Sequence, residues 1–418
     1  MQTVEILALA VFIVTYLLIA VNRTPWFEIK RSYAALFGAV LMLIIGALSF
    51  TDAFDSVDFK VLSLLLGMMT MVAALEYTGF FTMVSDLLLR WSGPGYRLLL
   101  LIMVVSAFLS AIALNDAVVL MFTPIVIKCC RKLDVNPIPY LVGLMMSANI
   151  GSIATAVGNP QNAYIASYAN LDFAEFSLYS IPIAVACLAV TYLILLLLFR
   201  NNLSERKEIG HADEENMEID RLRISLMVII VNVTFICFIL TGFFDFELYQ
   251  VALIAGAVSL MVVISSEVKD VIWVAGRIDW HILLFFIGLF ILIGGAAQSG
   301  LIADIADNVP GFGEGETPNS VSLSVFSVIL SNLVSNVPAV MLIVQMLPAS
   351  DLMIWIVLAA SSTLAGNTTL LGSAANIIVA ERSEGYGIRI DFFRFMVAGI
   401  IVTAATIVVM LLCVTIMF

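Results

Sequence analysis

Two stretches of this chain share one pattern, and both lie in strongly apolar surroundings. Residues 57–67 read Val-Asp-Phe-Lys-Val-Leu-Ser-Leu-Leu-Leu-Gly, and residues 278–288 read Ile-Asp-Trp-His-Ile-Leu-Leu-Phe-Phe-Ile-Gly. Their offset of 221 residues recurs further along and then becomes 214. The matching positions are Gly79 with Gly300, Ser110 with Ser331, Asn115 with Asn336, Thr155 with Thr369, Gly158 with Gly372, and Asn162 with Asn376. The chain is therefore predicted to contain two copies of one unit.

The composition places both copies in a membrane. Hydrophobic residues make up 62% of the chain, charged residues make up 12%, and the mean hydropathy is +1.10. Soluble domains contain about 45–50% apolar and about 25% charged residues. A chain of 418 residues can supply about ten spans of roughly 20 residues each. The first apolar run, residues 6–21, has no basic segment before it and no cleavage site after it, so we expect a retained helix.

Several apolar runs are too short to cross a membrane alone. Residues 117–128, 163–169, 338–348 and 374–381 each follow a polar break. Such breaks indicate re-entrant hairpins and discontinuous helices, because irregular backbone is tolerated at membrane depth only inside protein or beside water. We predict an all-α polytopic membrane protein with two inverted-topology repeats, each of five spanning helices (one broken) plus a re-entrant hairpin.

The predicted boundaries follow from these breaks. The first repeat covers residues 1–200, a cytoplasmic linker covers 201–222, and the second repeat covers 223–418. The predicted hairpins are 98–130 and 320–348, and the predicted broken helices are 139–169 and 352–382.

The distribution of basic residues tests this arrangement, because cytoplasmic loops carry an excess of Lys and Arg. With five crossings in each half, every one of the 19 lysines and arginines except Lys60 falls on one face. Treating the hairpins as full crossings scatters the basic residues over both faces. The arrangement therefore predicts that both termini lie outside.

Four clusters of Gly, Asn, Ser and Thr mark the predicted breaks. Where a helix restarts within the membrane, its first N–H groups have no partner and its dipole places partial positive charge there. An anion satisfies those donors, while unwound carbonyls and side-chain oxygens bind a cation nearby. Close helix packing explains one such cluster equally well, but four clusters in two inverted pairs favour a binding site. The candidate substrate-binding residues are Asn115, Thr155, Gly158, Asn159, Gln161, Asn162, Ser335, Asn336, Gly366, Asn367, Thr368, Thr369, Ser373 and Asn376.

Asp116 is the acid expected at the first hairpin tip, near the middle of the bilayer. A carboxylate there is costly unless it is paired or hydrated, so Asp116 is the candidate for the coupling ion, a proton or sodium. An equally good interpretation is a cap for the second arm of the hairpin. The aligned residue in the second copy is Val337, so the halves differ chemically. A sodium site is considered near Asn115, Asp116, Asn159, Asn336 and Asn367.

Glu76 and His281 are both expected at helix ends, where interfacial roles are favoured over a relay. No basic residue is expected near the middle of the membrane, so an anion would be bound by backbone dipoles and neutral side chains. The five cysteines match no metal spacing, and their odd number argues against a disulfide framework. The chain has no catalytic constellation and no Walker A loop, so neither an enzyme nor an ATP-driven pump is expected, and no cofactor or metal is expected beyond a coupling sodium.

The four clusters resemble the ion transporter superfamily, which includes arsenite permeases, D-type sodium/proton antiporters, citrate transporters and divalent-anion/sodium symporters. Residues 115–124 resemble the Asn-Asp-Gly/Ala…Thr-Pro stretch of arsenite-permease-like proteins, and residues 158–162 resemble the Gly-Asn/Asp-Pro-x-Asn motif of the same group. Residues 335–340 and 364–376 are similar to its second-half motifs. The resemblance implies a scaffold domain, a mobile transport domain with both hairpins and both broken helices, elevator-like alternating access, and a homodimer in many members.

The chain departs from parts of this pattern. Sodium/dicarboxylate symporters carry paired Ser-Asn-Thr motifs at the hairpin tips, whereas this chain has Leu114-Asn115-Asp116 and Ser335-Asn336-Val337. No cysteine lies in the four clusters, so a thiolate site for arsenite is not supported.

These observations favour a secondary transporter of the cytoplasmic (inner) membrane that moves a small anion or oxyanion with a proton or sodium gradient. Two alternatives share the fold: a sodium/proton antiporter, and an arsenite or antimonite efflux permease. A channel or a non-transporting membrane scaffold belongs to a different class, and it is disfavoured because polarity is concentrated at the breaks. The expected partners are the anion, the lipid bilayer and a second copy, and no nucleic acid.

Overall fold

A computed structural model describes residues 3–20, 30–91, 93–203, 220–264, 268–312, 318–347 and 351–418. Within these ranges the chain forms helices and turns, with no strand. Six of the described helices are long and apolar enough to cross a membrane. Most of the predicted 201–222 linker, residues 204–219, lies outside the described residues, as does residue 348 at the end of the second predicted hairpin. The division of the chain into repeats at this linker stays a prediction.

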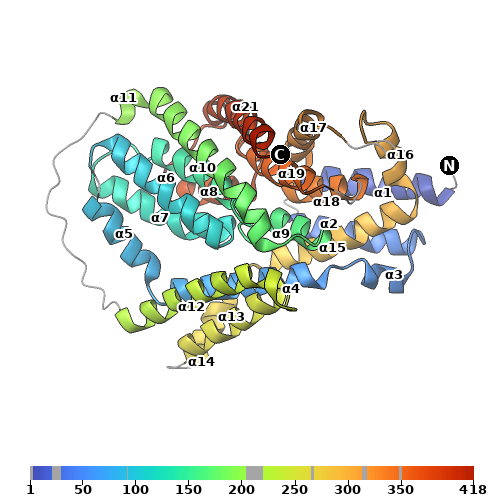
Figure 1. Ribbon diagram of the computed structural model, residues 1–418, viewed down its shortest axis with the longest axis horizontal. Coiled ribbons are helices and arrows are strands. Elements are labelled where there is room, and N and C mark those ends of the chain that lie inside the picture. Colours follow the sequence, from blue (N-terminus) through green and yellow to red (C-terminus); the bar gives the residue numbers. More distant parts are fainter. Residues whose placement is uncertain are drawn as a thin grey trace.

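The helices follow one another in a similar order in the two halves (Figure 1). The first half contains α1 (Thr3–Ala20), α2 (Arg31–Ile44), α3 (Phe50–Asp55), α4 (Phe59–Tyr77), α5 (Phe80–Trp91), α6 (Gly95–Ile112), α7 (Asn115–Lys132), α8 (Ile138–Ser152), α9 (Pro160–Tyr168), α10 (Phe173–Leu198) and α11 (Arg200–Leu203). The second half contains α12 (Arg221–Leu240), η1 (Thr241–Phe243), α13 (Leu248–Ile264), α14 (Val268–Arg277), α15 (Trp280–Gln298), α16 (Leu301–Asp307), α17 (Ser320–Val334), α18 (Asn336–Met346), α19 (Leu352–Ala365), α20 (Ala374–Gly385) and α21 (Phe392–Met417).

The two halves contact each other through two pairs of packed helices, each pair with one helix from either half. Helix α4 packs against α13, and its counterpart α15 packs against α2. Each contact has a glycine at the end of a repeated stretch: a Cβ on Gly67 would overlap the backbone of Ala252, and a Cβ on Gly288 would overlap the backbone of Ala35. Small residues permit such close helix contact. The 221-residue offset therefore has a physical basis in two equivalent helix crossings.

Two hairpins and two broken helices occupy the other part of the fold. Helices α6 and α7 meet at residues 113–114, and α17 and α18 meet at Ser335. Helix α8 stops at Ser152 and restarts as α9, while α19 stops at Ala365 and restarts as α20. Helix α7 packs on α20, and α18 packs on α9, so each hairpin contacts the restarted helix of the other half. This confirms the predicted all-helical class with paired hairpins and broken helices.

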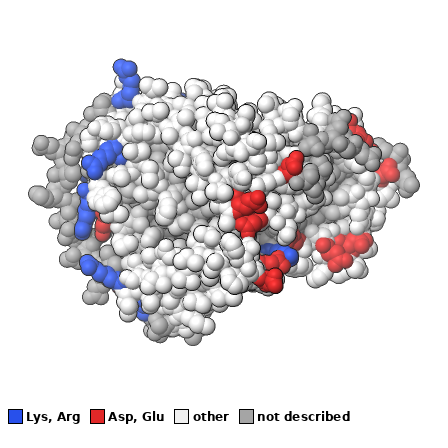
Figure 2. Space-filling model, in the orientation of Figure 1, with Lys and Arg blue, Asp and Glu red and all other residues white. Residues whose placement is uncertain are grey.

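Short helices outside the predicted spans complete the fold. Helix α5 buries Phe81, Val84, Ser85 and Leu88 on one face, at helical spacing. A search for continuous apolar runs misses such an amphipathic helix, because its polar residues interrupt every run. On the face drawn in Figure 2, Lys and Arg gather at the end where α5 and α11 lie, and most of the Asp and Glu lie away from that end.

Candidate functional site

The break between α8 and α9 is held together by two asparagines. Asn159 caps α9, because its side chain accepts a hydrogen bond from the backbone N–H of Asn162 at 2.8 Å. The Asn162 amide nitrogen donates to the carbonyls of Ser152 and Thr155, both at 3.1 Å. Pro160 occupies the first turn of α9, where a missing N–H is tolerated. The unwound carbonyls are therefore satisfied by side chains in a fully buried place.

The break between α19 and α20 repeats this arrangement. The Asn376 amide nitrogen donates to the carbonyls of Gly366 at 2.7 Å and Thr369 at 3.1 Å. These are the positions equivalent to Ser152 and Thr155 at the 214-residue offset. One difference is the cap, because the Ser373 side chain makes no capping bond to α20. It donates instead to Asn149 Oδ1 at 3.0 Å.

Asn149, in the last turn of α8, connects two of the four clusters, the first hairpin tip and the second break. Its oxygen accepts from Ser373 and from the Asn115 amide at 3.2 Å. Its nitrogen donates to Asn367 Oδ1 at 2.9 Å and Asn376 Oδ1 at 3.2 Å. Every hydrogen-bonding valence of this amide is used, and the side chain is buried.

The position of Asn149 in the second half is taken by Thr363, which makes the matching connection. Its hydroxyl accepts from Asn159 Nδ2 at 3.2 Å and Gln161 Nε2 at 3.3 Å. The two broken helices thus cross where α8 and α19 end, and each restart contacts the end of the other half's helix.

Both hairpin tips reach this crossing. The Asn115 backbone N–H donates to the Gly158 carbonyl at 3.0 Å. Oriented to donate, the Asn336 amide nitrogen is 3.0 Å from the Gly372 carbonyl oxygen and 3.2 Å from that of Ser362. Gly366 lies against Asn336 and has no room for a side chain there. The four predicted clusters therefore come together in the fold.

Three predicted threonines face other neighbours. Thr155 donates to the Ala111 carbonyl on α6 at 2.6 Å. Thr368 bonds Thr403 on α21 at 3.2 Å, and Thr369 lies 3.5 Å from the Asn332 side chain on α17. These hydroxyls bind the breaks to flanking helices.

Two buried polar atoms at the crossing have no hydrogen-bond partner within the described part of the chain. They are the amide nitrogen of Asn367 and the amide oxygen of Asn162, and both side chains are completely buried. A buried unpaired donor or acceptor costs about 1–3 kcal/mol. A ligand or ion that contacts either atom would remove this cost.

Asp116 lies in the first turn of α7 and acts on another helix. Its carboxylate faces the backbone N–H of Ala375, in the first turn of α20. It thus lies beside the helix start that the Ser373 side chain leaves without a capping bond. An anionic group is favourable at a helix N-terminus. The interpretation of Asp116 as the cap of α7 is wrong, because Leu114 is the N-cap residue of that helix and no side chain caps it.

One basic residue that the sequence does not associate with the clusters reaches the second hairpin tip. Arg31, the first residue of α2, donates from Nη1 to the Ser335 hydroxyl at 3.3 Å. Ser335 forms the second hairpin tip at φ 81°, a strained backbone conformation for a residue other than glycine. The Arg31 charge also acts on Asp116, as does the charge of Asp279. The sequence predicts Arg31 to lie in a cytoplasmic loop, whereas in the structure it is the first residue of α2. The helix has only 14 residues, so its length does not indicate how deep its first residue lies in the membrane.

The other two singled-out side chains lie at helix ends. Glu76 is half-buried and pairs with Arg277 at 3.5 Å. His281 Nε2 accepts a hydrogen bond from Lys30 Nζ at 2.8 Å, and His281 Nδ1 lies 3.3 Å from the Ser32 hydroxyl.

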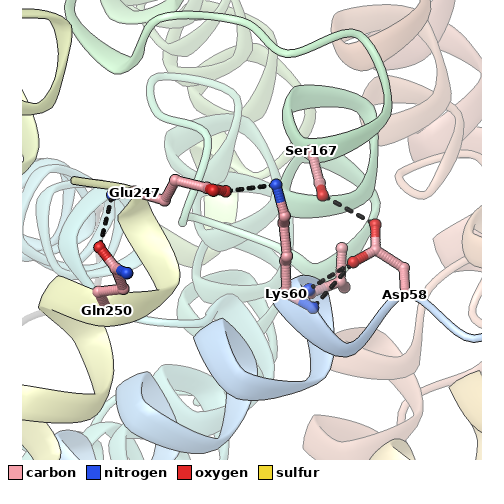
Figure 3. A network of polar contacts seen from close by, with 6 residues as sticks. Asp58, Lys60, Ser167, Glu247 and Gln250 are labelled. Carbon is pink, nitrogen blue, oxygen red and sulfur yellow. Dashed lines mark hydrogen bonds and ion pairs between the residues drawn. The ribbon is translucent and has the colours of Figure 1, made fainter. Parts of the chain in front are cut away.

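A polar cavity of about 550 Å³ lies between α4, α9 and the start of α13. Figure 3 shows its main contacts: Lys60 pairs with Glu247 at 2.6 Å, and Ser167 donates to Asp58 at 2.8 Å. Asp58 also caps α4 through the backbone N–H groups of Lys60 and Val61. Asp279 caps α15 in the same way, so both repeated stretches begin with the same helix-start device.

Comparison with known proteins shows to which class of protein this fold belongs. The citrate transporter family model matches residues 16–360, which is most of the chain. The chain therefore belongs to the citrate transporter family, within the ion transporter superfamily, and it is a multi-pass membrane transporter.

Individual relatives agree with this assignment. A 46 kDa membrane protein of Mycobacterium leprae is 31% identical over 96% of both chains. The silicon efflux transporter LSI3 of Oryza sativa subsp. japonica is 29% identical over 89% of both chains. The putative transporter arsB of Dictyostelium discoideum is 26% identical over 93% of this chain and 88% of its own.

Among solved structures, the YdaH transporter of Alcanivorax borkumensis, described as having an unusual topology, matches with a TM-score of 0.57. The match covers 99% of this chain and 98% of that one at 14% identity. At that identity the likeness concerns the fold alone.

Proposed function

We propose that this protein is a secondary transporter that moves a small anion or oxyanion, together with a proton or sodium ion, across the cytoplasmic membrane. The observation that carries the proposal is the pair of unpartnered atoms at the crossing of the broken helices. The Asn367 nitrogen is a buried donor for an anion, and the Asn162 oxygen is a buried acceptor for a cation.

The residues around these two atoms have complementary tasks. The Asn149 amide nitrogen donates to the Asn367 amide oxygen and thereby fixes the orientation of the Asn367 side chain. The Asn367 nitrogen consequently faces away from that bond. Asp116 faces the restart of α20 at Ala375 and is the proposed coupling residue. Neutral amides contribute no net charge to the site. They would therefore distinguish one substrate from another by its geometry and by the number of oxygens that it presents.

The names of relatives support a small oxygen-rich substrate. The family is described as transporting citrate, and one relative is named a silicon efflux transporter. The proposed mechanism is alternating access, in which the hairpins and broken helices move as one domain against α2, α4, α13 and α15. The proposed orientation has both termini outside, and a homodimer is proposed from the resemblance.

Two other functions compete within the same fold. Asp116 at a helix N-terminus favours a sodium/proton antiporter, in which no oxyanion is moved. A neutral oxyacid such as arsenous acid would need only the amides and hydroxyls of the crossing.

Transport by the purified full chain in proteoliposomes tests these functions. Uptake of citrate, phosphate, sulfate, arsenite and silicic acid is measured with an imposed proton or sodium gradient. Gradient-driven uptake of an anion supports the proposal. Proton exchange driven by sodium, with no solute moved, would replace it by the antiporter, and movement of arsenite or silicic acid alone would replace it by the neutral-oxyacid permease.

A further inference from the structure

Arg31 contributes a positive charge between the two hairpin tips, a place where no cation was expected. Its guanidinium meets the second tip through Ser335, and its charge acts on Asp116, which belongs to the first. The side chain is half-buried, and its Nε atom is buried without a partner among the described residues.

The guanidinium has hydrogen-bonding capacity that the protein leaves unused. A guanidinium carries five N–H donors in a planar fork, and a carboxylate or another oxyanion binds that fork with two parallel hydrogen bonds. The buried Nε donor is one of the atoms that such a bidentate contact uses. A buried donor that stays unpaired is unfavourable, so a bound oxyanion would remove an existing penalty.

We propose that Arg31 binds the transported oxyanion, together with the Ser335 hydroxyl, and that Asp116 competes with this anion for the Arg31 charge. This proposal rests on the proposed function and deepens it, because it names a cationic anchor for the substrate. Two negative groups beside one guanidinium repel each other, so the anion binds best when Asp116 is neutralised by a proton or compensated by sodium. Binding of the anion and of the coupling cation therefore favour each other, as symport requires.

The charged groups around Asp116 define this competition. Arg31 at the start of α2 and the N-terminus of α20, through Ala375, favour the carboxylate, while Asp279 before α15 opposes it. Two further groups that can carry positive charge are close in sequence: Lys30 precedes Arg31, and His281 follows Asp279 by two residues. In the second half the residue equivalent to Asp116 is Val337, and α13 starts with Leu248 where α2 starts with Arg31. The pair of charges is therefore not needed to form this fold, because the other half forms the same elements without it.

The test compares anion binding and uptake in the full chain and four variants: Arg31→Gln, Arg31→Lys, Asp116→Asn and Arg90→Gln. The probes are citrate, phosphate, sulfate and arsenite, and binding is measured as the rise in melting temperature with concentration. Arg90 is an exposed arginine in the last turn of α5, so Arg90→Gln is the matched control for loss of one positive charge.

We expect Arg31→Gln to weaken binding of the recognised anion about tenfold or more, since it removes a charged hydrogen-bond donor. Arg31→Lys keeps the charge but loses the fork, so it should bind with intermediate affinity. Asp116→Asn should bind the anion more tightly than the wild type, and its affinity for sulfate should no longer change with pH. The Arg90→Gln variant should match the wild type.

Equal anion affinity in the wild type and Arg31→Gln would overturn the proposal, as would unchanged affinity and unchanged pH response in Asp116→Asn. If Arg31→Gln does not fold, Arg31→Lys and Asp116→Asn decide the question, because both preserve the shape of the site. A wild type that neither binds nor moves any of the anions would instead refute the proposed function itself. Anion uptake by the wild type that persists unchanged in Arg31→Gln and Arg31→Lys would refute only the role of Arg31.

Discussion

Asn162 and Asn376 make the same pair of hydrogen bonds in the two halves of the chain. Each amide nitrogen donates to a carbonyl at the end of the preceding helix and to a second carbonyl three residues later. A broken helix leaves these carbonyls without their normal partners, and in a water-free interior they must be satisfied by side chains. The two asparagines are therefore required by the breaks themselves.

Removing either amide should destabilise the protein. Asn162→Ala and Asn376→Ala each remove two hydrogen bonds to buried carbonyls at a break, and we expect a loss of about 1–3 kcal/mol in the free energy of unfolding. Thermal melting in detergent measures this loss. Asn232→Ala is the control, because the Asn232 amide donates to Val228 in an exposed place on α12. Equal melting temperatures for Asn162→Ala and Asn232→Ala would contradict the assignment.

The sequence could predict Asn162 and Asn376 because a broken helix requires side-chain donors for its unpaired carbonyls. A polar side chain at a fixed offset, within an otherwise apolar run, indicates a backbone that needs a partner. Asn149 and Thr363 were missed although the same 214-residue offset relates them. Their residue types differ, and each lies within an apolar helix, so neither looks like a break. Only the crossing of the two helices brings them to the site.

Replacing Asn149 should reduce transport more than it reduces the stability of the protein. Asn149→Leu fills the volume but removes the bonds to Asn115, Ser373, Asn367 and Asn376. Asn367 then loses the contact that orients it, so uptake of the transported anion should fall at least about tenfold. Proteoliposome uptake checks this, with melting temperature measured on the same sample. Normal uptake by Asn149→Leu would show that the orientation of Asn367 has no role in transport.

Gly67 and Gly288 should tolerate no side chain, because each allows one helix to contact the backbone of another. Gly67→Ala and Gly288→Ala should each reduce stability by about 1–3 kcal/mol, since two backbones must separate to admit a methyl group. Gly276→Ala on α14 is the control, because a Cβ there meets nothing within 4 Å. Its stability should stay within about 1 kcal/mol of the wild type. Thermal melting of the three variants decides, and a neutral Gly67→Ala would mean that the α4–α13 contact relaxes easily.

Arg31 shows the limit of sequence reasoning in this chain. Charge and hydropathy placed it in a basic cytoplasmic segment, which fits its neighbours along the chain. Its contact with Ser335 joins residues 304 positions apart, and no local pattern encodes such a distance. The offsets could predict which elements are equivalent, but they could not predict which side chains of one half reach the other.

The contacts of Figure 3 provide a direct test of domain movement. Asp58 on the helix start of α4 and Ser167 on α9 would belong to different domains, whereas Lys60 and Glu247 would both belong to the scaffold. In a background with Cys237→Ser and Cys413→Ser, a short bifunctional thiol reagent is applied to Asp58→Cys/Ser167→Cys and to Lys60→Cys/Glu247→Cys. If α9 moves against α4 during transport, the first cross-link should reduce uptake to background, and reduction with a thiol should restore it. The second cross-link should leave uptake unchanged, because it joins parts that stay together. Full uptake with Asp58 and Ser167 linked would show that transport proceeds without this movement, and the elevator-like mechanism would have to be replaced by a local opening of the hairpins.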